Sequence, residues 1–193
     1  MANKTAICTT SMGSFTIELY TNDMPITSYN FIDLVKNKFY DGLHIHRCVS
    51  DFVIQMGCPH SKTIHCNNVG SGAPEPNSTY EIPGNKTITR NDAGNIPDEF
   101  LDDACPKHSN LPFTISMANI GQPESGGSQI FINTTDNSIM DFFNNSAPVQ
   151  HPVFGKVISG TDVIMNIVNV PVAKTSYLPI TPIEIISIVM NED

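Results

Sequence analysis

The sequence predicts a mainly β fold whose helices lie at the ends of the strands. Three observations favour this class: most apolar segments are short and strand-like, only two segments have helical periodicity, and strands and helices do not alternate regularly. The length of 193 residues fits a single domain, residues 1–193, and is sufficient to bury a core.

The N-terminal third contains the clearest elements. Residues 5–20 alternate apolar and polar side chains around a turn at Gly13, which predicts a β-hairpin. Residues 25–37 switch to a helical period, with Pro25 suited to the first turn and Asp23 as a candidate N-cap. The remaining predicted elements are two short strands within 43–57, strands at 113–117, 129–133, 153–158 and 183–190, and a helix at 161–169.

Two long irregular stretches interrupt this pattern. Residues 58–110 are rich in Gly, Pro, Asn and Asp, and they predict at most short strands around 78–82. Residues 141–150 form a second long loop. Surface loops of this length usually carry function or specialised additions to a fold.

Composition excludes several classes of protein. The net charge is −9 and no Lys/Arg cluster stands out, which argues against nucleic acid as a direct ligand. No apolar stretch is long enough to span a bilayer, and the N-terminus lacks the apolar run of a secretory signal. Five cysteines, an odd number, then favour reduced thiols in the cytoplasm or nucleus.

Arg47 is the most informative single residue. It is one of only two arginines and lies in the apolar, strand-like segment 43–57. A buried guanidinium group without partners is expensive. Arg47 therefore either pairs with an acidic neighbour or faces a cleft where a ligand supplies the partner.

Arg47 belongs to the first of three motifs that are spaced along the chain. They are HRCVSDFVIQMG at 46–57, SMAN at 116–119 followed by GSQIFI at 127–132, and HPVFGK at 151–156. Together, and in this order, they resemble the cyclophilins, a family of peptidyl-prolyl cis-trans isomerases, over nearly the whole chain. The resemblance implies a closed eight-stranded antiparallel β-barrel capped by two α-helices, with the active site on the outer surface of the barrel.

The resemblance also implies roles for individual residues. The implied catalytic residues are Arg47, Phe52, Gln55 and Phe131, and the implied substrate-binding residues are Val53, Ala118, Asn119, Gln129, Met140 and His151. The expected partners are proline-containing peptides and proteins, with no cofactor or metal and a monomeric chain. A permanently charged Arg47 aimed at the prolyl nitrogen would favour the twisted form of the bond over either planar form.

The sequence departs from the family at informative positions. Ile139 replaces a tryptophan that donates a hydrogen bond to cyclosporin in many members, so we expect weak cyclosporin binding with activity retained. Val53 stands where methionine is common, a change that should be tolerated. The stretch 141–150 before His151 is longer than in the family, so the position of His151 depends on how this stretch folds.

Two alternatives stay open at this point. The chain could be a binding module that holds a proline-containing segment of a larger assembly with little turnover. The loop residues Cys58, His60, His65 and Cys66 could bind zinc, or the two cysteines could form a redox-sensitive disulfide. The spacing of these four residues is not that of the usual zinc sites, so reduced loop thiols are the preferred interpretation.

Overall fold

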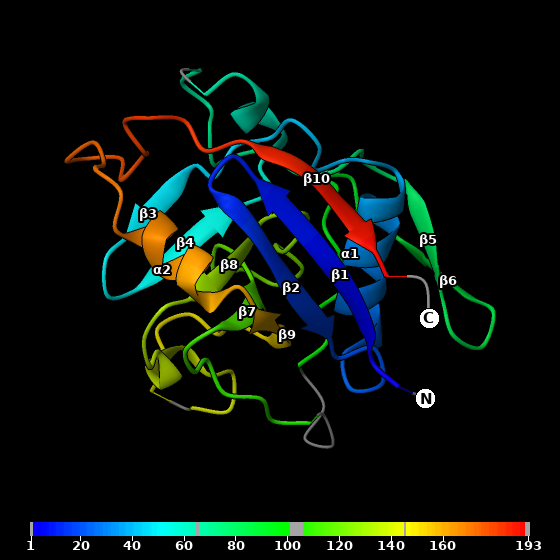
Figure 1. Ribbon diagram of the computed structural model, residues 1–193. Helices are drawn as coiled ribbons and strands as arrows, with labels where there is room; N and C mark the ends of the chain where they lie inside the picture. The colour runs from blue at the N-terminus through cyan, green and yellow to red at the C-terminus, as the bar shows by residue number, and fades with distance from the viewer. Residues whose placement is uncertain (1, 65, 101–105, 145, 192–193) are drawn as a thin grey trace.

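The computed structural model describes residues 2–64, 66–100, 106–144 and 146–191 (Figure 1). Its strands form one eight-stranded antiparallel sheet and one two-stranded hairpin. In chain order the elements are β1 (Lys4–Thr10), β2 (Gly13–Leu19), α1 (Pro25–Lys36), β3 (Arg47–Val49), β4 (Val53–Met56), η1 (Pro59–Lys62), β5 (Thr79–Ile82), β6 (Lys86–Thr89), β7 (Thr114–Met117), β8 (Ile130–Asn133), η2 (Ser138–Met140), β9 (Val153–Ser159), α2 (Thr161–Val168) and β10 (Ile185–Met190).

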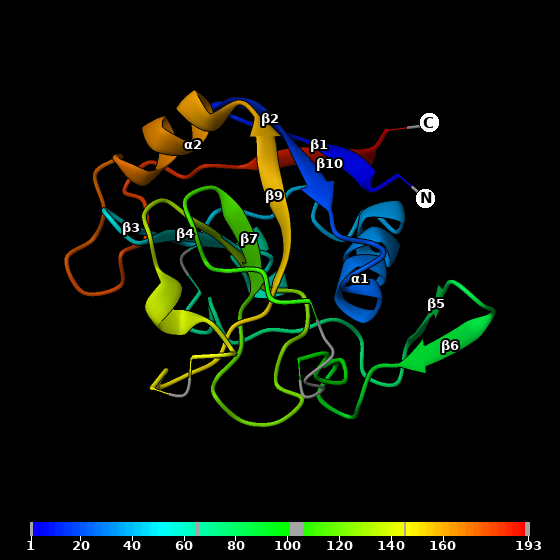
Figure 2. The same ribbon diagram turned by 90° about the horizontal axis from the view of Figure 1, so that it is seen from below.

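The predicted alternation places one side of every long strand in the core. In β2, for example, Phe15, Ile17 and Leu19 are buried, whereas the residues between them are more exposed. Figure 2 shows α1 and α2 well apart, with strands of the sheet between them. Neither helix, nor any other helix in the described ranges, is long and apolar enough to cross a membrane.

The large sheet is a half-barrel, and this corrects the expectation of a closed barrel. Its strand order is β10-β1-β2-β9-β7-β8-β4-β3, so β10 and β3 are its two edges. Between these edges, residues 42–45 contact residues 183–185 through the isolated bridge of His44 to Glu184 and the backbone hydrogen bonds beside it. Hydrogen bonding to the β10 side does not continue along β3. The amide of Cys48, on this edge of β3, donates instead to the carbonyl of Tyr177 at 2.9 Å.

The irregular region 58–110 contains a complete hairpin, of which only the first strand was predicted. Strands β5 and β6 pair around Gly84 and Asn85, whose φ angles of 87° and 55° suit a tight hairpin turn. The second strand has a single buried residue, Ile88, which explains the weak sequence signal. The hairpin packs beside α1 (Figures 1 and 2).

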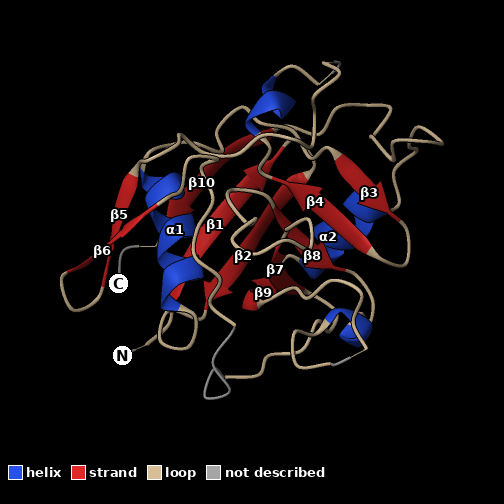
Figure 3. Cartoon of the chain, turned by 180° about the vertical axis from the view of Figure 1, so that it is seen from behind, coloured by secondary structure: helices blue, strands red, loops and turns tan. Residues whose placement is uncertain are grey.

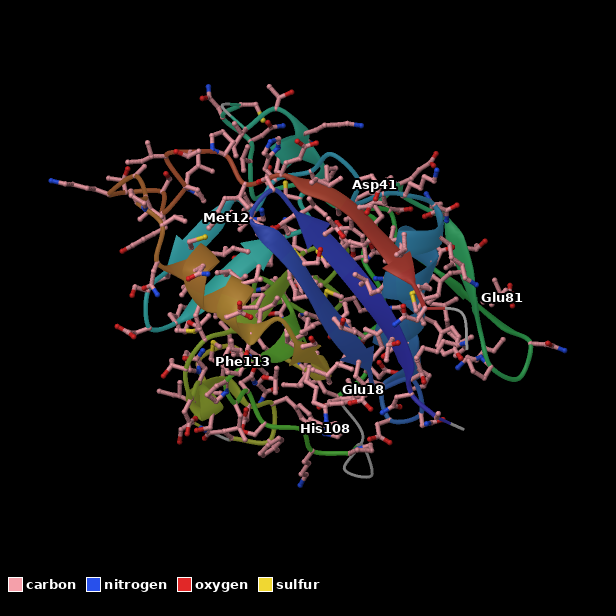
Figure 4. The ribbon with its side chains drawn as sticks, viewed as in Figure 1. Met12, Glu18, Asp41, Glu81, His108 and Phe113 are labelled. Carbon is pink, nitrogen blue, oxygen red and sulfur yellow. The ribbon has the colours of Figure 1, made fainter. Side chains whose placement is uncertain are left out.

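The N-terminus of α1 is capped from a distance. Asp23, the expected cap, makes no capping bond and instead accepts a hydrogen bond from the His108 ring at 2.8 Å; Figure 4 labels His108. The carboxylate of Glu99 accepts the first free amides of the helix, Ile26 N–H and, at 2.8 Å, Thr27 N–H. A carboxylate at this end satisfies unpaired donors and interacts favourably with the helix dipole.

Candidate active site

Arg47, Gln55 and Phe131 lie side by side across three strands. Arg47 pairs in register with Gln55 on β4, and Gln55 pairs with Phe131 on β8. Their neighbours Cys48 and Ile54 point the other way, into the main core. Two strand spacings separate the α-carbons of Arg47 and Phe131 by roughly 10 Å. The three predicted side chains therefore share the outer face of the sheet; Figure 3 shows the strands that carry them, β3, β4 and β8.

The two arginines of the chain have opposite environments. Arg90 is only 2% exposed and is fully engaged: its guanidinium donates to Asp33 at 2.7 Å and to Asn30 at 2.9 Å, and stacks over the Tyr80 ring. These contacts hold the β5–β6 hairpin to α1. Arg90 is thus the structural arginine of this fold.

Arg47 has no such anionic partner. Within the described ranges the half-buried Arg47 makes no ion pair, and its guanidinium carbon lies 5.9 Å from the ring centroids of both Phe52 and Tyr177. Two aromatic rings hold the cation without neutralising it. The acidic-neighbour alternative for Arg47 is therefore not realised among these residues, and its donors remain available to a ligand.

Tyr177 was not predicted as part of this site. It lies 130 positions after Arg47 in an exposed loop, and its φ of 57° is unusual for a tyrosine. The loop is fixed to β3 by the hydrogen bond from Cys48 N–H to the Tyr177 carbonyl. No local sequence pattern marks this contact.

Phe131, Met140 and His151 lie close together, where the resemblance implies the proline pocket. The His151 ring meets the Phe131 ring edge to face, with centroids 5.1 Å apart and an interplanar angle of 86°. His151 N–H donates to the carbonyl of Met140 at 3.0 Å, which brings Met140 to the same place. The long stretch 141–150 therefore still delivers His151 beside Phe131.

The His151 ring is held neutral and fixed in orientation. Its Nδ1 lies 3.1 Å from the carbonyl of Met117, so Nδ1 carries the hydrogen. Burial lowers the pKa of His151 below its usual value. A neutral ring at the rim adds apolar surface without repelling the Arg47 cation.

A buried polar network supports this pocket, and the sequence did not reveal it. Asp141 is 3% exposed and accepts hydrogen bonds from Ser109 Oγ at 2.6 Å and from Asn110 N–H at 2.7 Å. Asn110 in turn accepts from Ser116 Oγ at 2.7 Å and donates to the His151 carbonyl at 3.2 Å. Short polar side chains of these types are common in loops, so only their burial reveals the network.

Amide side chains connect the site to the inserted loop 58–72. Gln55 Nε2 donates to Gln129 Oε1 at 3.1 Å, and Gln129 Nε2 donates to the carbonyls of Gly70 and Gly72, each at 2.9 Å. An amide nitrogen carries two hydrogens, so Gln55 keeps one N–H for a ligand. Gln55 and Gln129 are thus adjacent; their role as a groove lining stays a prediction.

The SMAN segment borders the same groove. The Asn119 side chain is engaged at both ends, donating to the Gln150 carbonyl at 2.8 Å and accepting from Gly121 N–H at 3.0 Å. Ala118 N–H donates to the Gln129 carbonyl at 3.0 Å. The Asn119 side chain therefore shapes its loop, and a contact with a bound peptide would fall to its backbone.

A cavity of about 460 Å³ opens beside Arg47 and Gln55. Its walls include the buried His46 ring, Gly70 and Leu178. Burial lowers the pKa of His46 to about 4, so this ring is neutral at physiological pH. Among the described residues that line this cavity, Arg47 is consequently the only permanent charge.

The other predicted positions are as follows. Val53 is buried within β4, and Ile139 in η2 is 63% exposed next to Met140. Cys58 and Cys66 are free thiols, and Cys58 is fully buried. Of the proposed zinc ligands, His65 lies outside the described residues, and no group of three potential metal ligands occurs within them.

Comparison with known proteins agrees with this geometry. Residues 5–190 match the family model "Cyclophilin type peptidyl-prolyl cis-trans isomerase/CLD". A peptidyl-prolyl cis-trans isomerase of Acinetobacter baylyi is 32% identical over 97% of this chain and 86% of its own length. The isomerase ppi1 of Schizosaccharomyces pombe is 34% identical over 93% of this chain and 94% of its own length.

The fold is similar to that of a solved structure. A crystal structure of a Cryptosporidium parvum cyclophilin type peptidyl-prolyl cis-trans isomerase superposes with a TM-score of 0.73, at 24% identity, over 99% of both chains. With the family model matched across nearly the full length, this chain belongs to the cyclophilin-type peptidyl-prolyl cis-trans isomerases.

Proposed function

We propose that Arg47 is the electrostatic centre of prolyl isomerisation in this enzyme. The observation that carries the proposal is the contrast between the two arginines: Arg90 is fully paired, whereas Arg47 makes no ion pair within the described ranges. Arg47 also shares the outer face of the sheet with Phe131. A charged donor without an anion, on the same face as the Phe131 and His151 rings, is suited to a ligand that supplies the acceptor.

The chemistry follows from the nature of the prolyl bond. Resonance gives the bond partial double-bond character, so uncatalysed rotation takes tens to hundreds of seconds. When the bond twists, the nitrogen becomes pyramidal and its lone pair can accept a hydrogen bond. A guanidinium aimed at that lone pair stabilises the twisted form more than either planar form, which lowers the barrier.

The pocket residues hold the proline ring while the bond rotates. Phe131, Met140 and His151 lie together, with Phe52 against the Arg47 guanidinium and Val53 on the same strand as Gln55. Their apolar surface lowers the local dielectric, which strengthens the interaction of Arg47 with the reacting nitrogen. Gln55, Gln129, Ala118 and Asn119 line the groove that holds the peptide backbone on one side of the bond. Rotation breaks no covalent bond and needs no nucleophile.

The substrates are proline-containing peptides and proteins, and the chain acts as a monomer in the cytoplasm or nucleus. The compartment is supported by the cysteines, since Cys8, Cys48, Cys58 and Cys66 are all free thiols. Burial raises the pKa of Cys48 to about 12, which keeps this thiol protonated and unreactive at neutral pH.

The test is cis-trans exchange of a short Ala-Pro peptide measured by NMR, with the wild type, Arg47→Ala and Arg47→Lys. Loss of a preorganised donor should lower the catalysed rate about a hundred- to a thousandfold while peptide binding changes little. Arg47→Lys keeps the charge but loses the planar fork, so it should recover only part of the rate.

The alternative, a binding module with little turnover, predicts different results. The wild type would then bind the peptide while exchange stayed near its uncatalysed rate, and Arg47→Ala would bind equally well. The inserted loops, which reach the groove through Gly70, Gly72 and Gln150, are the feature that favours this alternative. Rapid exchange that survives Arg47→Ala would contradict the role assigned to Arg47.

A further inference from the structure

A second groove lies between α1 and the outer edge of β10, and none of the residues assigned to isomerisation lines it. Its volume is about 590 Å³. Ile32 and Val35 of α1 and Ile188 of β10 form a buried apolar floor. We call this feature the α1–β10 groove; Figure 1 shows β10 passing beside α1.

The groove contains an open edge of the large sheet. Strand β10 pairs with β1 on one side, where Asn191 N–H donates to the Thr5 carbonyl at 2.9 Å; on its other side the first residue, Ile185, bonds to Gly42 and Leu43, so the open edge begins after Ile185. Because alternate residues of an antiparallel edge strand direct their peptide groups to opposite sides, those of Ile188 and Met190 point away from β1. In agreement, Ile188 N–H donates at 3.3 Å to Asp41, which Figure 4 labels near β10.

The element facing this edge cannot complete it. The interior backbone amides of α1 are used within the helix, so α1 covers the apolar floor without adding a strand. Unpaired edge groups of a sheet are a template for pairing with an extended chain. An apolar floor beneath such an edge supplies pockets for alternate side chains of that chain.

The rim of the groove is positively charged on an acidic protein. Lys4, Lys36 and Lys38, three of the eight lysines, line it, although the chain carries a net charge of −9. All three are exposed, and none forms an ion pair with another described residue. Of the nearby carboxylates, Asp33 is already paired with Arg90 at 2.7 Å, and Asp41, which lines the groove, accepts from Ile188 N–H at 3.3 Å, so three lysines face one groove carboxylate. The charge therefore favours an acidic occupant.

We propose that the α1–β10 groove docks an extended segment of a partner protein in which acidic and apolar residues alternate. The segment adds to β10 as a further strand. Its apolar side chains face Ile32, Val35 and Ile188, and its carboxylates meet Lys4, Lys36 and Lys38. Main-chain pairing supplies affinity, and the lysines supply selectivity for acidic sequences.

The probe is a proline-free peptide, acetyl-(Glu-Val)₃-amide, titrated into the ¹⁵N-labelled full chain. Because it lacks proline, its binding is independent of isomerisation, and it should bind equally to Arg47→Ala. Amide shifts are expected in residues 186–191 and 32–38 and should weaken as salt is raised. The peptide acetyl-(Lys-Val)₃-amide should produce no such shifts.

Charge reversal tests the rim directly. The double variant Lys36→Glu, Lys38→Glu should weaken binding of the acidic peptide about tenfold or more. Lys86→Glu, an exposed position on β6 that does not line the groove, is the matched control and should bind like the wild type. If millimolar acidic peptide leaves the amide signals of the groove unshifted, the lysines serve only to prevent strand pairing at this edge, and the proposal is overturned. Shifts confined to the Arg47 site, or a dimer formed through β10 in light scattering, would overturn it equally.

Discussion

Removal of the Asp141 carboxylate should be the most damaging single polar substitution near the active site. Asp141 is 3% exposed, and its carboxylate accepts three hydrogen bonds: from Ser109 Oγ at 2.6 Å, from Asn110 N–H at 2.7 Å and from Asn110 Nδ2 at 2.9 Å. The substitution Asp141→Ala removes the acceptor from all three bonds: Asn110 N–H and one hydrogen of Asn110 Nδ2 are buried, the other Nδ2 hydrogen keeps the His151 carbonyl, and Ser109 is half-buried.

The size of the effect follows from these three donors. Each buried donor left unsatisfied costs about 1–3 kcal/mol, and relief of the buried charge offsets part of the total. We therefore expect Asp141→Ala to lower the free energy of unfolding by about 3–5 kcal/mol. Asp141→Asn keeps one carbonyl oxygen for Asn110, and the Ser109 hydroxyl can rotate to accept, so its cost should be about 1 kcal/mol.

The assay is urea unfolding followed by circular dichroism, with the midpoint and the slope fitted separately. Asp136→Ala is the control: Asp136 lies five positions earlier and accepts from Ser138 N–H at 3.0 Å, but it is exposed, so its loss should leave the unfolding midpoint almost unchanged. Equal effects of Asp141→Ala and Asp141→Asn would refute the reasoning, because the count of stranded donors would then not decide stability.

Catalysis gives a second readout of the same substitution. Asn110 donates to the His151 carbonyl, and His151 N–H donates to the Met140 carbonyl. In Asp141→Ala, assayed at a temperature where it stays folded, these pocket residues lose their anchor. We expect kcat/KM to fall about tenfold, as a displaced binding group would cause. Unchanged kcat/KM in a folded Asp141→Ala would show that the network supports stability alone.

Two further predictions concern single side chains. Because His46 has a folded pKa of about 4 against 6.5 when unfolded, the unfolded state binds the proton more tightly, and stability should fall by about 2 kcal/mol from pH 7.5 to pH 5. His46→Asn should remove that part of the pH dependence, and an unchanged slope would exclude His46 as its source. Ile139→Trp restores a donor at a 63% exposed position, so cyclosporin affinity measured by calorimetry should rise about tenfold. If affinity stays the same, another residue limits cyclosporin binding.

The sequence predicted elements where local pattern and burial agree. The hairpin formed by β1 and β2 and the helix α1 lie within a residue or two of their expected bounds, because one face of each is buried. Strand β6 was missed because it buries only Ile88 and carries threonine and lysine elsewhere. The cap of α1 was assigned to Asp23, but it comes from Glu99, which is more than seventy positions away and has no local signature.

In the active site, too, the residues within sequence motifs were predicted, and the residue brought in by a long-range contact was not. Arg47, Phe52 and Gln55 belong to one short motif, and their cross-strand neighbour Phe131 belongs to another, so recognising the motifs located them together. The contact of Tyr177 with Arg47 joins residues 130 positions apart and depends on how an exposed loop is held. Contacts of this kind follow from tertiary structure alone.

The inserted loops reach the site through backbone oxygen atoms. Gln129 binds the carbonyls of Gly70 and Gly72, and Asn119 binds the carbonyl of Gln150. Every residue type supplies a carbonyl acceptor, so the hydrogen bonds themselves need no particular side chain. Backbone geometry still favours glycine at two of these positions, because Gly70 has a φ of 93° and a Cβ at Gly72 would lie 2.7 Å from the Pro59 ring. The motif residues hold the loops, and the loops shape the groove. Substituting the loop side chain of Gln150 should consequently disturb the site far less than substituting Asn119, whose amide makes the bond.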